Sequence, residues 1–553
     1  MHRNDNRTQL ITGPIFMHRD RFLGNFLLTF KWIRRRAILF LLVAATCSSA
    51  AASDHELSFA WPVDLGPLNP HLYAPNQMFA QSMVFEPLVK YRSDGSTVPW
   101  LARSWTVSED GRTYRFNLRD DVRFSNGEQF TAHTVQENFR AILDNIDRHR
   151  WLELANQIRR FKAIDDYTFE LELKNPYYPI LQELALARPF RFIAPSQFVD
   201  GGTKKGIKAP VGTGPWKLVQ SNLGQDYRFE RNEGYWGDKP AYGAVKVKIL
   251  PDPNSRSIAF ETGQIDFLYG TSGPISPDSY ERFSKKPELS VQLSEPYQTL
   301  TFALNSSRGP TADLSVRKAI NHAVNKDLIV QTILHGTQKK ADTLFASNVP
   351  YADIHLQPYK FDPELAERML ETAGWTRSAA GAIRVRGGTS LEIDLAFIGN
   401  DPVSRSIAEV VQADLAKVGI AITLIGEEES SIYARQRDGR FGMIFNRTWG
   451  APYDPHAFVS SMRFPTHADY QAQSGLPSKK HIDALIGEVL SSTDEQQRQA
   501  IYRSILSELH EQAVYLPLTY ITAMALARPG ISNISFGAMA SDIPFETLQP
   551  APE

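Results

Sequence analysis

Hydrophobic and polar residues alternate along several short stretches of the chain, as in strands that bury one face. Residues 167–173 alternate at period two, and residues 245–250 do so up to Pro251. Proline has no backbone N–H to donate, so it is a natural end for that strand. The same pattern predicts further strands at residues 58–61, 113–118, 299–303, 391–397, 421–425 and 515–521.

Other stretches carry their hydrophobic residues at helical spacing. In residues 131–143 the apolar side chains recur every three or four positions, and Thr131 stands where a helix cap is expected. Further helices are predicted at residues 315–334, 363–373, 403–418 and 494–512. Alternating strands and helices of this kind are typical of α/β layers, in which helices cover the sheets. Because no low-complexity linker interrupts the pattern, we expect domains that share more than one chain crossing.

The N-terminal residues have a different pattern. Lys31 and residues 34–36, all arginine, precede an apolar run over residues 37–45, and small residues continue to Ala52. This order predicts a secretory signal, with cleavage after Ala50 or Ala52. A membrane anchor is the alternative, but the run is far shorter than the ~20 apolar residues that span a bilayer. We therefore assign residues 1–53 to the signal peptide and upstream residues, and expect a periplasmic mature chain.

Composition limits the classes of function. The 553 residues are 42% hydrophobic and 11% aromatic, which is typical of a large globular protein and excludes disorder. Without residues 1–53 the chain has 52 basic and 59 acidic residues, a net charge of −7, so a dedicated nucleic-acid binder is not expected. The lone cysteine, Cys47, leaves with the signal, so no disulfide or thiolate metal ligand remains.

Catalytic signatures are absent from the sequence. It contains no Gly-x-Ser-x-Gly elbow, no phosphate-binding loop and no zinc-protease motif; His510-Glu511 comes closest to the last, but Val514 occupies the second ligand position. The eleven histidines after residue 53 are dispersed, and none are two to four residues apart. We therefore expect no enzyme and no resident cofactor, although a hydrolase or a chaperone stays open as an alternative.

Several motifs, taken in order, resemble the extracellular solute-binding proteins of peptide and nickel ABC importers. The resemblance covers essentially the whole mature chain, and one stretch around residues 60–73 is similar to the nickel-binding members in particular. The motifs are Phe85-Glu86-Pro87-Leu88, Pro99-Trp100-Leu101-Ala102, Phe124-Ser125-Asn126-Gly127, Val211-Gly212-Thr213-Gly214-Pro215-Trp216, Arg231-Asn232-Glu233-Gly234-Tyr235-Trp236, Glu261-Thr262-Gly263-Gln264-Ile265-Asp266 and Val316-Arg317-Lys318-Ala319-Ile320.

This resemblance implies a fold. It is the α/β, two-lobed periplasmic-binding-protein fold, type II, of the peptide/nickel-binder subclass, with an extra subdomain in the first lobe. Residues 54–297 would form lobe I with the subdomain, residues 298–520 lobe II, and residues 521–553 a return to lobe I. The ligand would be trapped between the lobes by hinge closure.

The resemblance also implies a ligand site. Arg148 and Arg188 would hold the carboxylates of a small chelator bidentately, and His467 would be the one metal ligand from the protein. The chelator, a polycarboxylate or free histidine, would complete the coordination of nickel(II). The remaining site residues would be three flat aromatic walls, two residues on the first-lobe side and one hydroxyl: Trp151, Trp449, Tyr453, Tyr73, Met78 and Ser541.

Each of these residues has an ordinary structural alternative. A tryptophan is usually part of a core, Arg148 belongs to a charged run, and His467 lies between Pro465 and Asp469 as in a surface loop. Three positions also depart from the family pattern: Ala74 and Ser541 stand in place of threonine, and Asn446 in place of histidine. A lost hydroxyl would change which chelator fits rather than the class of ligand.

The function implied is capture of a nickel chelate and its delivery to an inner-membrane ABC permease and its ATPases by a monomeric receptor. A dipeptide- or oligopeptide-binding receptor of the same fold is the alternative. That alternative would need an acidic residue placed for the peptide amino group and would have no use for His467.

Overall fold

The computed structural model describes residues 55–74, 78–271 and 273–551, which belong to one compact unit. The predicted signal peptide lies outside the described residues. Within the described ranges, no helix is both long enough and apolar enough to cross a membrane.

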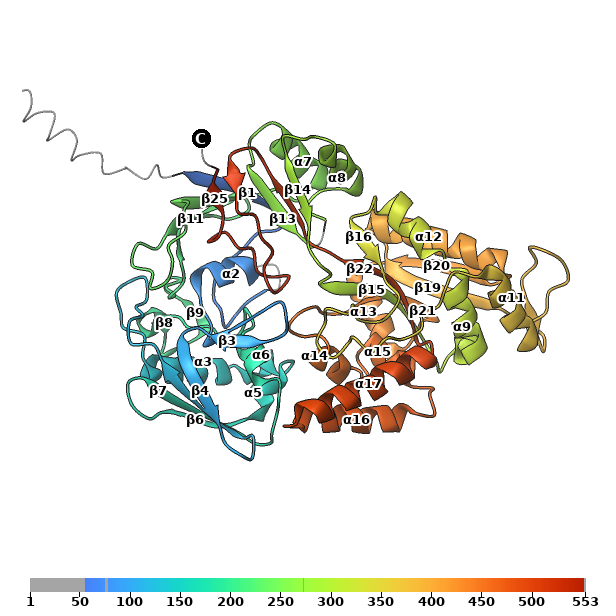
Figure 1. Ribbon diagram of the computed structural model, residues 1–553, viewed down its shortest axis with the longest axis horizontal. Coiled ribbons are helices and arrows are strands. Elements are labelled where there is room, and N and C mark those ends of the chain that lie inside the picture. The colour runs from blue at the N-terminus through green and yellow to red at the C-terminus, as the bar shows by residue number, and fades with distance from the viewer. Residues whose placement is uncertain (1–54, 75–77, 272, 552–553) are drawn as a thin grey trace, which may run out of the picture. The chain divides into compact units, whose positions relative to one another are not determined.

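The first lobe is built on a seven-stranded mixed sheet (Figure 1). β1 runs parallel to β12, with Phe59 opposite Val247, and both side chains are buried in the lobe core. In spatial order the strands are β10 (Trp216–Asn222), β11 (Asp226–Arg231), β12 (Ala244–Ile249), β1 (Glu56–Trp61), β13 (Phe267–Gly270), β23 (Met524–Ala527) and β14 (Ser290–Leu293). The helices of this lobe outside the subdomain are α2 (Met78–Val84), α7 (Pro253–Glu261) and α8 (Pro277–Ser284).

A four-stranded antiparallel sheet forms the subdomain of the first lobe. Its strands, in spatial order, are β4 (Ala102–Val107), β5 (Thr113–Leu118), β7 (Thr168–Leu173) and β6 (Ile158–Ala163). Helix α3 (Ala132–Leu143) covers the sheet, and the ring of Phe139 lies 4.9 Å from that of Phe169. Three short helices follow from the same region: α4 (Ile146–His149), α5 (Glu153–Gln157) and α6 (Ile180–Leu184).

The second lobe contains a six-stranded sheet with helices packed against it. The strands are, in spatial order, β16 (Gln338–Lys340), β22 (Tyr515–Ile521), β15 (Gln298–Leu304), β21 (Met443–Arg447), β19 (Glu392–Ile398) and β20 (Ala421–Glu427). Its helices are α9 (Leu314–Ala323), α10 (Lys326–Leu328), α11 (Pro363–Thr372), α12 (Pro402–Lys417), α13 (Glu429–Asp438), α14 (His456–Ser461), α15 (Ala468–Gln473), α16 (Lys479–Ser491) and α17 (Glu495–Glu511).

Short paired strands complete the secondary structure. They are β2 (Val89–Tyr91) with β3 (Thr97–Pro99), β8 (Phe198–Val199) with β9 (Gly202–Ile207), β17 (Val385–Arg386) with β18 (Thr389–Ser390), and β24 (Ile531–Ser532) with β25 (Gln549–Pro550). The chain passes from the first large sheet to the second between β14 and β15, and returns between β22 and β23. The lobe boundaries expected from the sequence, at residues 297/298 and 520/521, stay predictions; the first lies directly before β15, and the second lies within the last residues of β22.

The sequence pattern identified these elements well. All eight predicted strands are confirmed to within two residues at each end: β1, β5, β7, β12, β15, β19, β20 and β22. The helices expected over 131–143, 363–373, 403–418 and 494–512 are confirmed as α3, α11, α12 and α17. Thr131 caps α3 as expected, through a capping box with Thr134.

One predicted helix is wrong. Residues 315–334 do not form a single helix, because α9 ends at Ala323 and Val324 is extended. The side chain of Asn325 then accepts a hydrogen bond from the backbone N–H of Leu328, which starts α10 and a π-helical turn over Ile329–Ile333. The backbone N–H of Asn325 donates to a carboxylate oxygen of Asp414 at 2.9 Å, so a tertiary contact holds the break in place.

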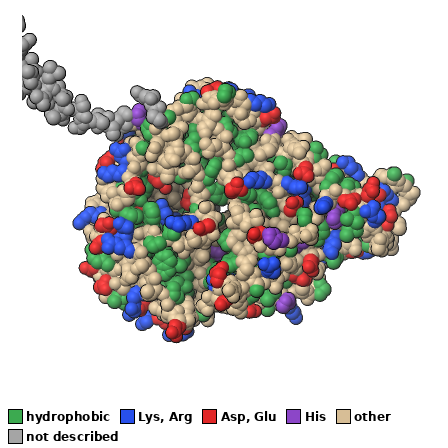
Figure 2. Space-filling model, in the orientation of Figure 1, with side chains coloured by type: hydrophobic (Ala, Val, Ile, Leu, Met, Phe, Trp, Pro, Cys, Tyr) green, Lys and Arg blue, Asp and Glu red, His purple; other side chains and the backbone are tan. Residues whose placement is uncertain are grey.

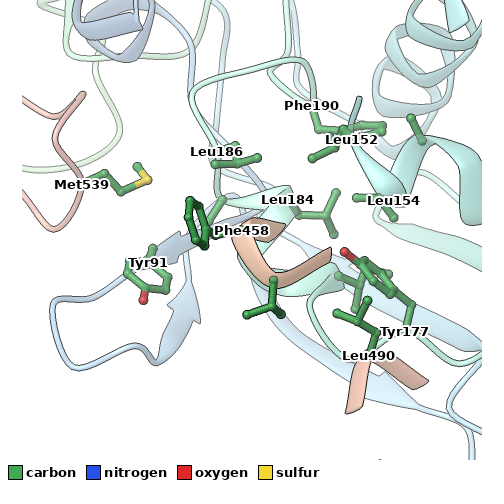
Figure 3. Close-up of a cluster of buried hydrophobic side chains, with 14 of the residues drawn as sticks. Tyr91, Leu152, Leu154, Tyr177, Leu184, Leu186, Phe190, Phe458, Leu490 and Met539 are labelled. Atoms are coloured by element: carbon green, nitrogen blue, oxygen red, sulfur yellow. The ribbon is translucent and has the colours of Figure 1, made fainter. Parts of the chain in front are cut away.

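The two lobes share one hydrophobic cluster. Leu184 and Leu186 of the first lobe belong to the same cluster of buried residues as Phe458 and Leu490 of the second. Figure 3 shows these side chains together, with Tyr177 of the first lobe among them. The lobes are therefore packed against each other along the subdomain.

Candidate ligand-binding site

Tyr73 is the centre of the first-lobe side of the site. Its side chain is buried, and its hydroxyl oxygen accepts a hydrogen bond from Nε1 of Trp151 at 2.6 Å. The same hydroxyl lies 3.3 Å from Nδ1 of the buried His149. Burial, reinforced by the neighbouring arginines, lowers the pKa of His149 to about 4. Its imidazole is therefore neutral at pH 7 and can accept a hydrogen bond from the Tyr73 hydroxyl. This chain of contacts fixes the orientation of Trp151.

Two arginines pack on this aromatic group. The guanidinium carbon of Arg188 lies 4.5 Å from the ring centre of Tyr73 and 4.8 Å from that of Trp151. Arg148 lies 5.1 Å from the Tyr73 ring and donates a hydrogen bond to the Tyr73 carbonyl oxygen. Nε of Arg188 is buried and has no hydrogen-bond partner among the described residues. A buried donor without a partner is uncommon, so Arg188 has capacity for an acceptor that a ligand can supply.

The second lobe contributes the facing wall. Trp449 and Tyr453 lie in the loop that follows β21, and the Tyr453 ring is 6.2 Å from the ring of Trp151. Asp454 holds this loop, because its carboxylate accepts hydrogen bonds from the backbone N–H groups of Trp449 at 3.1 Å and Gly450 at 2.9 Å. Burial raises the pKa of Asp454 to about 7. The aromatic walls of the two lobes thus meet across the site.

His467 lies beside Trp449 on the second-lobe side of the site. It precedes α15, and its ring lies 5.8 Å from the ring of Trp449. Burial lowers the pKa of His467, so the neutral imidazole, which has a free lone pair, is the dominant form at neutral pH. Its ring nitrogens make no hydrogen bond within the described ranges of the chain. In those ranges no group of three or more His, Cys, Asp or Glu side chains is arranged to hold a metal ion.

Two cavities meet at Trp449. The first, which we call the His467 cavity, has a volume of about 450 Å³, and Trp151, Trp449 and His467 are among its lining residues. The second, the Ser541 cavity, has a volume of about 390 Å³ and is lined in part by Met78, Trp449, Tyr453 and Ser541. Both volumes fall in the range of small-molecule sites.

The residues predicted from the sequence are therefore gathered in one region. Six of them line the two cavities, and the other three, Tyr73, Arg148 and Arg188, pack against the aromatic walls rather than lining either cavity. Their roles in ligand binding stay predictions. Asn446, which departs from the family pattern, donates a hydrogen bond to Asp469 at 2.7 Å and so has a structural role.

Other residues of the site were not identified from the sequence. Glu183 lines the His467 cavity as a buried carboxylate and accepts hydrogen bonds from the Tyr177 hydroxyl at 2.5 Å and the Leu154 backbone N–H at 2.7 Å. Nε2 of His456, from the second lobe, lies 3.6 Å from Glu183. No local pattern distinguishes Glu183 from the other acidic residues, because its partners Tyr177, Leu154 and His456 are brought to it by the fold.

Comparison with known proteins gives consistent results. The profile of the bacterial extracellular solute-binding proteins, family 5 (middle region), matches residues 96–470. The nickel-binding periplasmic protein of Escherichia coli K12 is 58% identical over 93% of this chain and 98% of its own. The dipeptide-binding protein of the same organism is 25% identical over 91% of this chain and 96% of its own. A crystal structure of NikA from Brucella suis in complex with Fe(III)-EDTA superposes with a TM-score of 0.88 and 63% identity, covering 90% of this chain and all of that one.

Proposed function

Because the chain belongs to family 5 of the bacterial extracellular solute-binding proteins, we propose that it captures a nickel chelate outside the cytoplasm and delivers it to an ABC permease and its ATPase. It acts as a periplasmic receptor rather than an enzyme. The similarity to the nickel-binding periplasmic protein supports the metal, and the similarity to NikA in complex with Fe(III)-EDTA supports a metal bound together with a carboxylate chelator.

The observation that carries the proposal is the single accessible imidazole of His467. It lies beside Trp449 in the lining of a cavity large enough for a small complex, and no second histidine or cysteine lines that cavity among the described residues. One imidazole cannot fill the coordination sphere of nickel, so a chelator supplies the other donor atoms. We propose free histidine or a small polycarboxylate for this role.

The other side chains bind the chelator rather than the metal. Arg188 and Arg148 offer fork-shaped donors that match carboxylate geometry. Trp151, Trp449 and Tyr453 exclude water, which strengthens each charge interaction within the site. Because these residues come from both lobes, a ligand that contacts all of them stabilises the closed form, which is a shift of population toward closure.

A peptide receptor is the competing function, given the 25% identity to a dipeptide-binding protein. A peptide amino group needs a carboxylate with a free oxygen. Glu183 already accepts two hydrogen bonds, and Asp454 accepts two from backbone N–H groups, so neither is available for that task without losing a buried bond. Glu153, which also lines the His467 cavity, accepts one hydrogen bond among the described residues, from Gln157 at 2.6 Å, so a peptide receptor would have to use this carboxylate.

Calorimetric titration of the chain from residue 54 tests the proposal. Nickel is added with and without excess free histidine, and a mixture of di- and tripeptides is added separately. We expect micromolar or tighter binding that requires the chelator, and no binding of peptides. Saturation by peptides, together with indifference to nickel, would instead identify a peptide receptor.

A further inference from the structure

A buried carboxylate lies two residues after His467 in the second lobe. On the face of the molecule in Figure 2, basic and acidic side chains are interspersed, whereas Asp469 is in the interior and only 2% exposed. It belongs to the first turn of α15, the helix that begins directly after His467. Removing a carboxylate from water costs free energy unless hydrogen bonds replace its hydration. The partners of Asp469 therefore indicate its role.

Two strands of the second-lobe sheet supply these partners. Nδ2 of Asn446, on β21, donates to Oδ1 of Asp469 at 2.7 Å, and the buried hydroxyl of Tyr515, on β22, donates to the same oxygen at 2.9 Å. Both strands pair with β15, one on each side of it. Asp469 therefore ties the start of α15 to the middle of the sheet. We call Asn446, Asp469 and Tyr515 the Asp469 clamp.

The position of the His467 side chain depends on its backbone. Metal-binding histidines commonly donate their second ring N–H to a carboxylate or a carbonyl oxygen, which fixes the ring. The ring of His467 makes no such hydrogen bond among the described residues, and its side chain does not cap α15. Its backbone carbonyl accepts a hydrogen bond from the N–H of Gln471 at 3.4 Å, within α15. A displacement of α15 would therefore move the imidazole with it.

The same clamp is connected to the facing tryptophan. Asn446 lies three residues before Trp449 in the chain, at the end of β21, and the rings of Trp449 and His467 are 5.8 Å apart. One carboxylate thus joins the strand that leads to Trp449 and the helix that follows His467. Its hydrogen bonds fix these two segments relative to each other.

Resting on the proposed function, we infer that Asp469 is a positioning residue for nickel capture, which with Asn446 and Tyr515 sets the place of the His467 imidazole relative to Trp449. A metal ligand has to be held within about 0.5 Å of its productive position. Loss of the clamp would release the start of α15 and weaken the bond from the imidazole to the metal, although Asp469 itself contacts neither the metal nor the chelator.

Four variants of the clamp test the inference. Asp469→Ala removes the acceptor, whereas Asp469→Asn keeps an oxygen that can accept both hydrogen bonds. Asn446→Ala and Tyr515→Phe remove one donor each, and they carry the test if Asp469→Ala does not fold. Asp414→Ala is the matched control, because Asp414 is a buried aspartate of α12 that accepts hydrogen bonds but lines neither cavity among the described residues.

Affinity and metal coordination are measured separately. Calorimetric titration with nickel plus free histidine, and with nickel plus citrate, gives the affinity, and unfolding midpoints establish that each variant is folded. X-ray absorption of the nickel–citrate complex of the protein reports the coordination. Because citrate contains no imidazole, scattering from an imidazole ring at nickel comes from the protein.

We expect Asp469→Ala to weaken nickel binding at least tenfold and to reduce the imidazole scattering. Asn446→Ala and Tyr515→Phe should each cost about threefold in affinity, while Asp469→Asn should stay within about threefold and retain the imidazole signal. Asp414→Ala should bind within about twofold of the wild type, even where its unfolding midpoint falls as far as that of Asp469→Ala.

Two results would overturn the inference and leave the proposed function standing. The first is Asp469→Ala with the affinity and the imidazole signal of the wild type. The second is an equal loss of affinity in Asp469→Ala and Asp414→Ala, which would reflect general destabilisation. If the wild type binds neither nickel complex, the proposed function itself fails, and the inference with it.

Discussion

The hydroxyl groups of Tyr178 and Tyr502 lie 2.7 Å apart and are hydrogen-bonded, although the first belongs to the first lobe and the second to α17 of the second lobe. Two further contacts surround this bond. The backbone N–H of Tyr178 donates to the carbonyl oxygen of Leu490 at 3.1 Å, and the guanidinium of Arg498 lies 4.7 Å from the Tyr178 ring. All three contacts exist only when the lobes are together, so they stabilise the closed form.

Replacement of Tyr178 by phenylalanine should therefore weaken ligand binding from a distance. One lost hydrogen bond costs about 1 kcal/mol, so the ratio of closed to open form should fall roughly fivefold and the ligand should dissociate correspondingly faster. Stopped-flow tryptophan fluorescence measures this rate. Tyr520→Phe is the matched control, because its hydroxyl bonds Thr343 at 2.8 Å within the second lobe, and it should leave the rate unchanged. Equal effects of the two variants would contradict a role for Tyr178 in closure.

Asp454→Asn should alter the dependence of stability on pH. The folded-state pKa of Asp454, about 7, lies above the ordinary aspartate value of 3.8, so the folded protein holds this proton more tightly than the unfolded chain. The contribution of the Asp454 carboxyl to the free energy of unfolding is at its full value below pH 4, and it is lost as the pH rises through 7. Between pH 5 and pH 8 the wild type should lose about 2–3 kcal/mol of unfolding free energy more than the variant.

Urea unfolding at pH 5 and pH 8 provides the comparison. Burial also raises the pKa of Asp469 and of Asp542 to about 6, but both groups titrate in the wild type and in the variant. The difference in pH dependence between the two proteins therefore reports Asp454 together with its Coulombic effect on Asp469. Identical pH dependence in the two proteins would show that Asp454 is ionised at pH 5 in the folded state.

Trp151→Phe should weaken chelate binding while leaving the fold intact. The substitution keeps an aromatic wall but removes the Nε1–H that bonds the Tyr73 hydroxyl at 2.6 Å. Trp151 is 42% exposed, so the loss of hydrophobic burial is small. We expect affinity for the nickel complex to fall about three- to tenfold, with an unfolding midpoint within about 2 °C of the wild type. Unchanged affinity would mean that the Trp151–Tyr73 pair does not shape the site.

His467→Ala should abolish or greatly weaken binding of the nickel complex. The imidazole is the one donor that we assign to the metal, and its removal leaves only contacts to the chelator. His481→Ala is the control, because His481 is exposed on α16 and lines neither cavity among the described residues. Titration calorimetry should give at least a tenfold loss for the first variant and no loss for the second. Comparable binding by both variants would show that His467 does not bind the metal.

Strands and helix caps that depend only on neighbouring residues in the chain could be predicted from the sequence. Alternation at residues 245–250 and the cap at Thr131 are local signals, and both elements are present in the fold. Asn325 is also a local signal, a cap in the middle of an apolar run, and its side-chain bond explains why one predicted helix divides into two. The break between α9 and α10 can therefore be predicted from the sequence at Asn325.

Other parts of the site depend on tertiary packing. Glu183 and His456 are 273 positions apart, and their proximity follows only from the contact between the lobes. The lining of the Ser541 cavity likewise cannot be recognised from neighbours in sequence, because it combines Met78, Arg447 and Ser541 from distant segments. The family resemblance supplied Tyr73, Arg188 and His467, which composition and spacing alone could not distinguish from core or surface residues.

Native mass spectrometry of the chain from residue 54, loaded with nickel in the presence of free histidine and of citrate, tests the central claim most directly. The mass of the adduct identifies what is bound. The account predicts an adduct of one nickel ion together with its chelator, which disappears in His467→Ala. An adduct of nickel alone, or of a peptide carried through purification with no nickel, would contradict the claim that this protein binds a metal chelate.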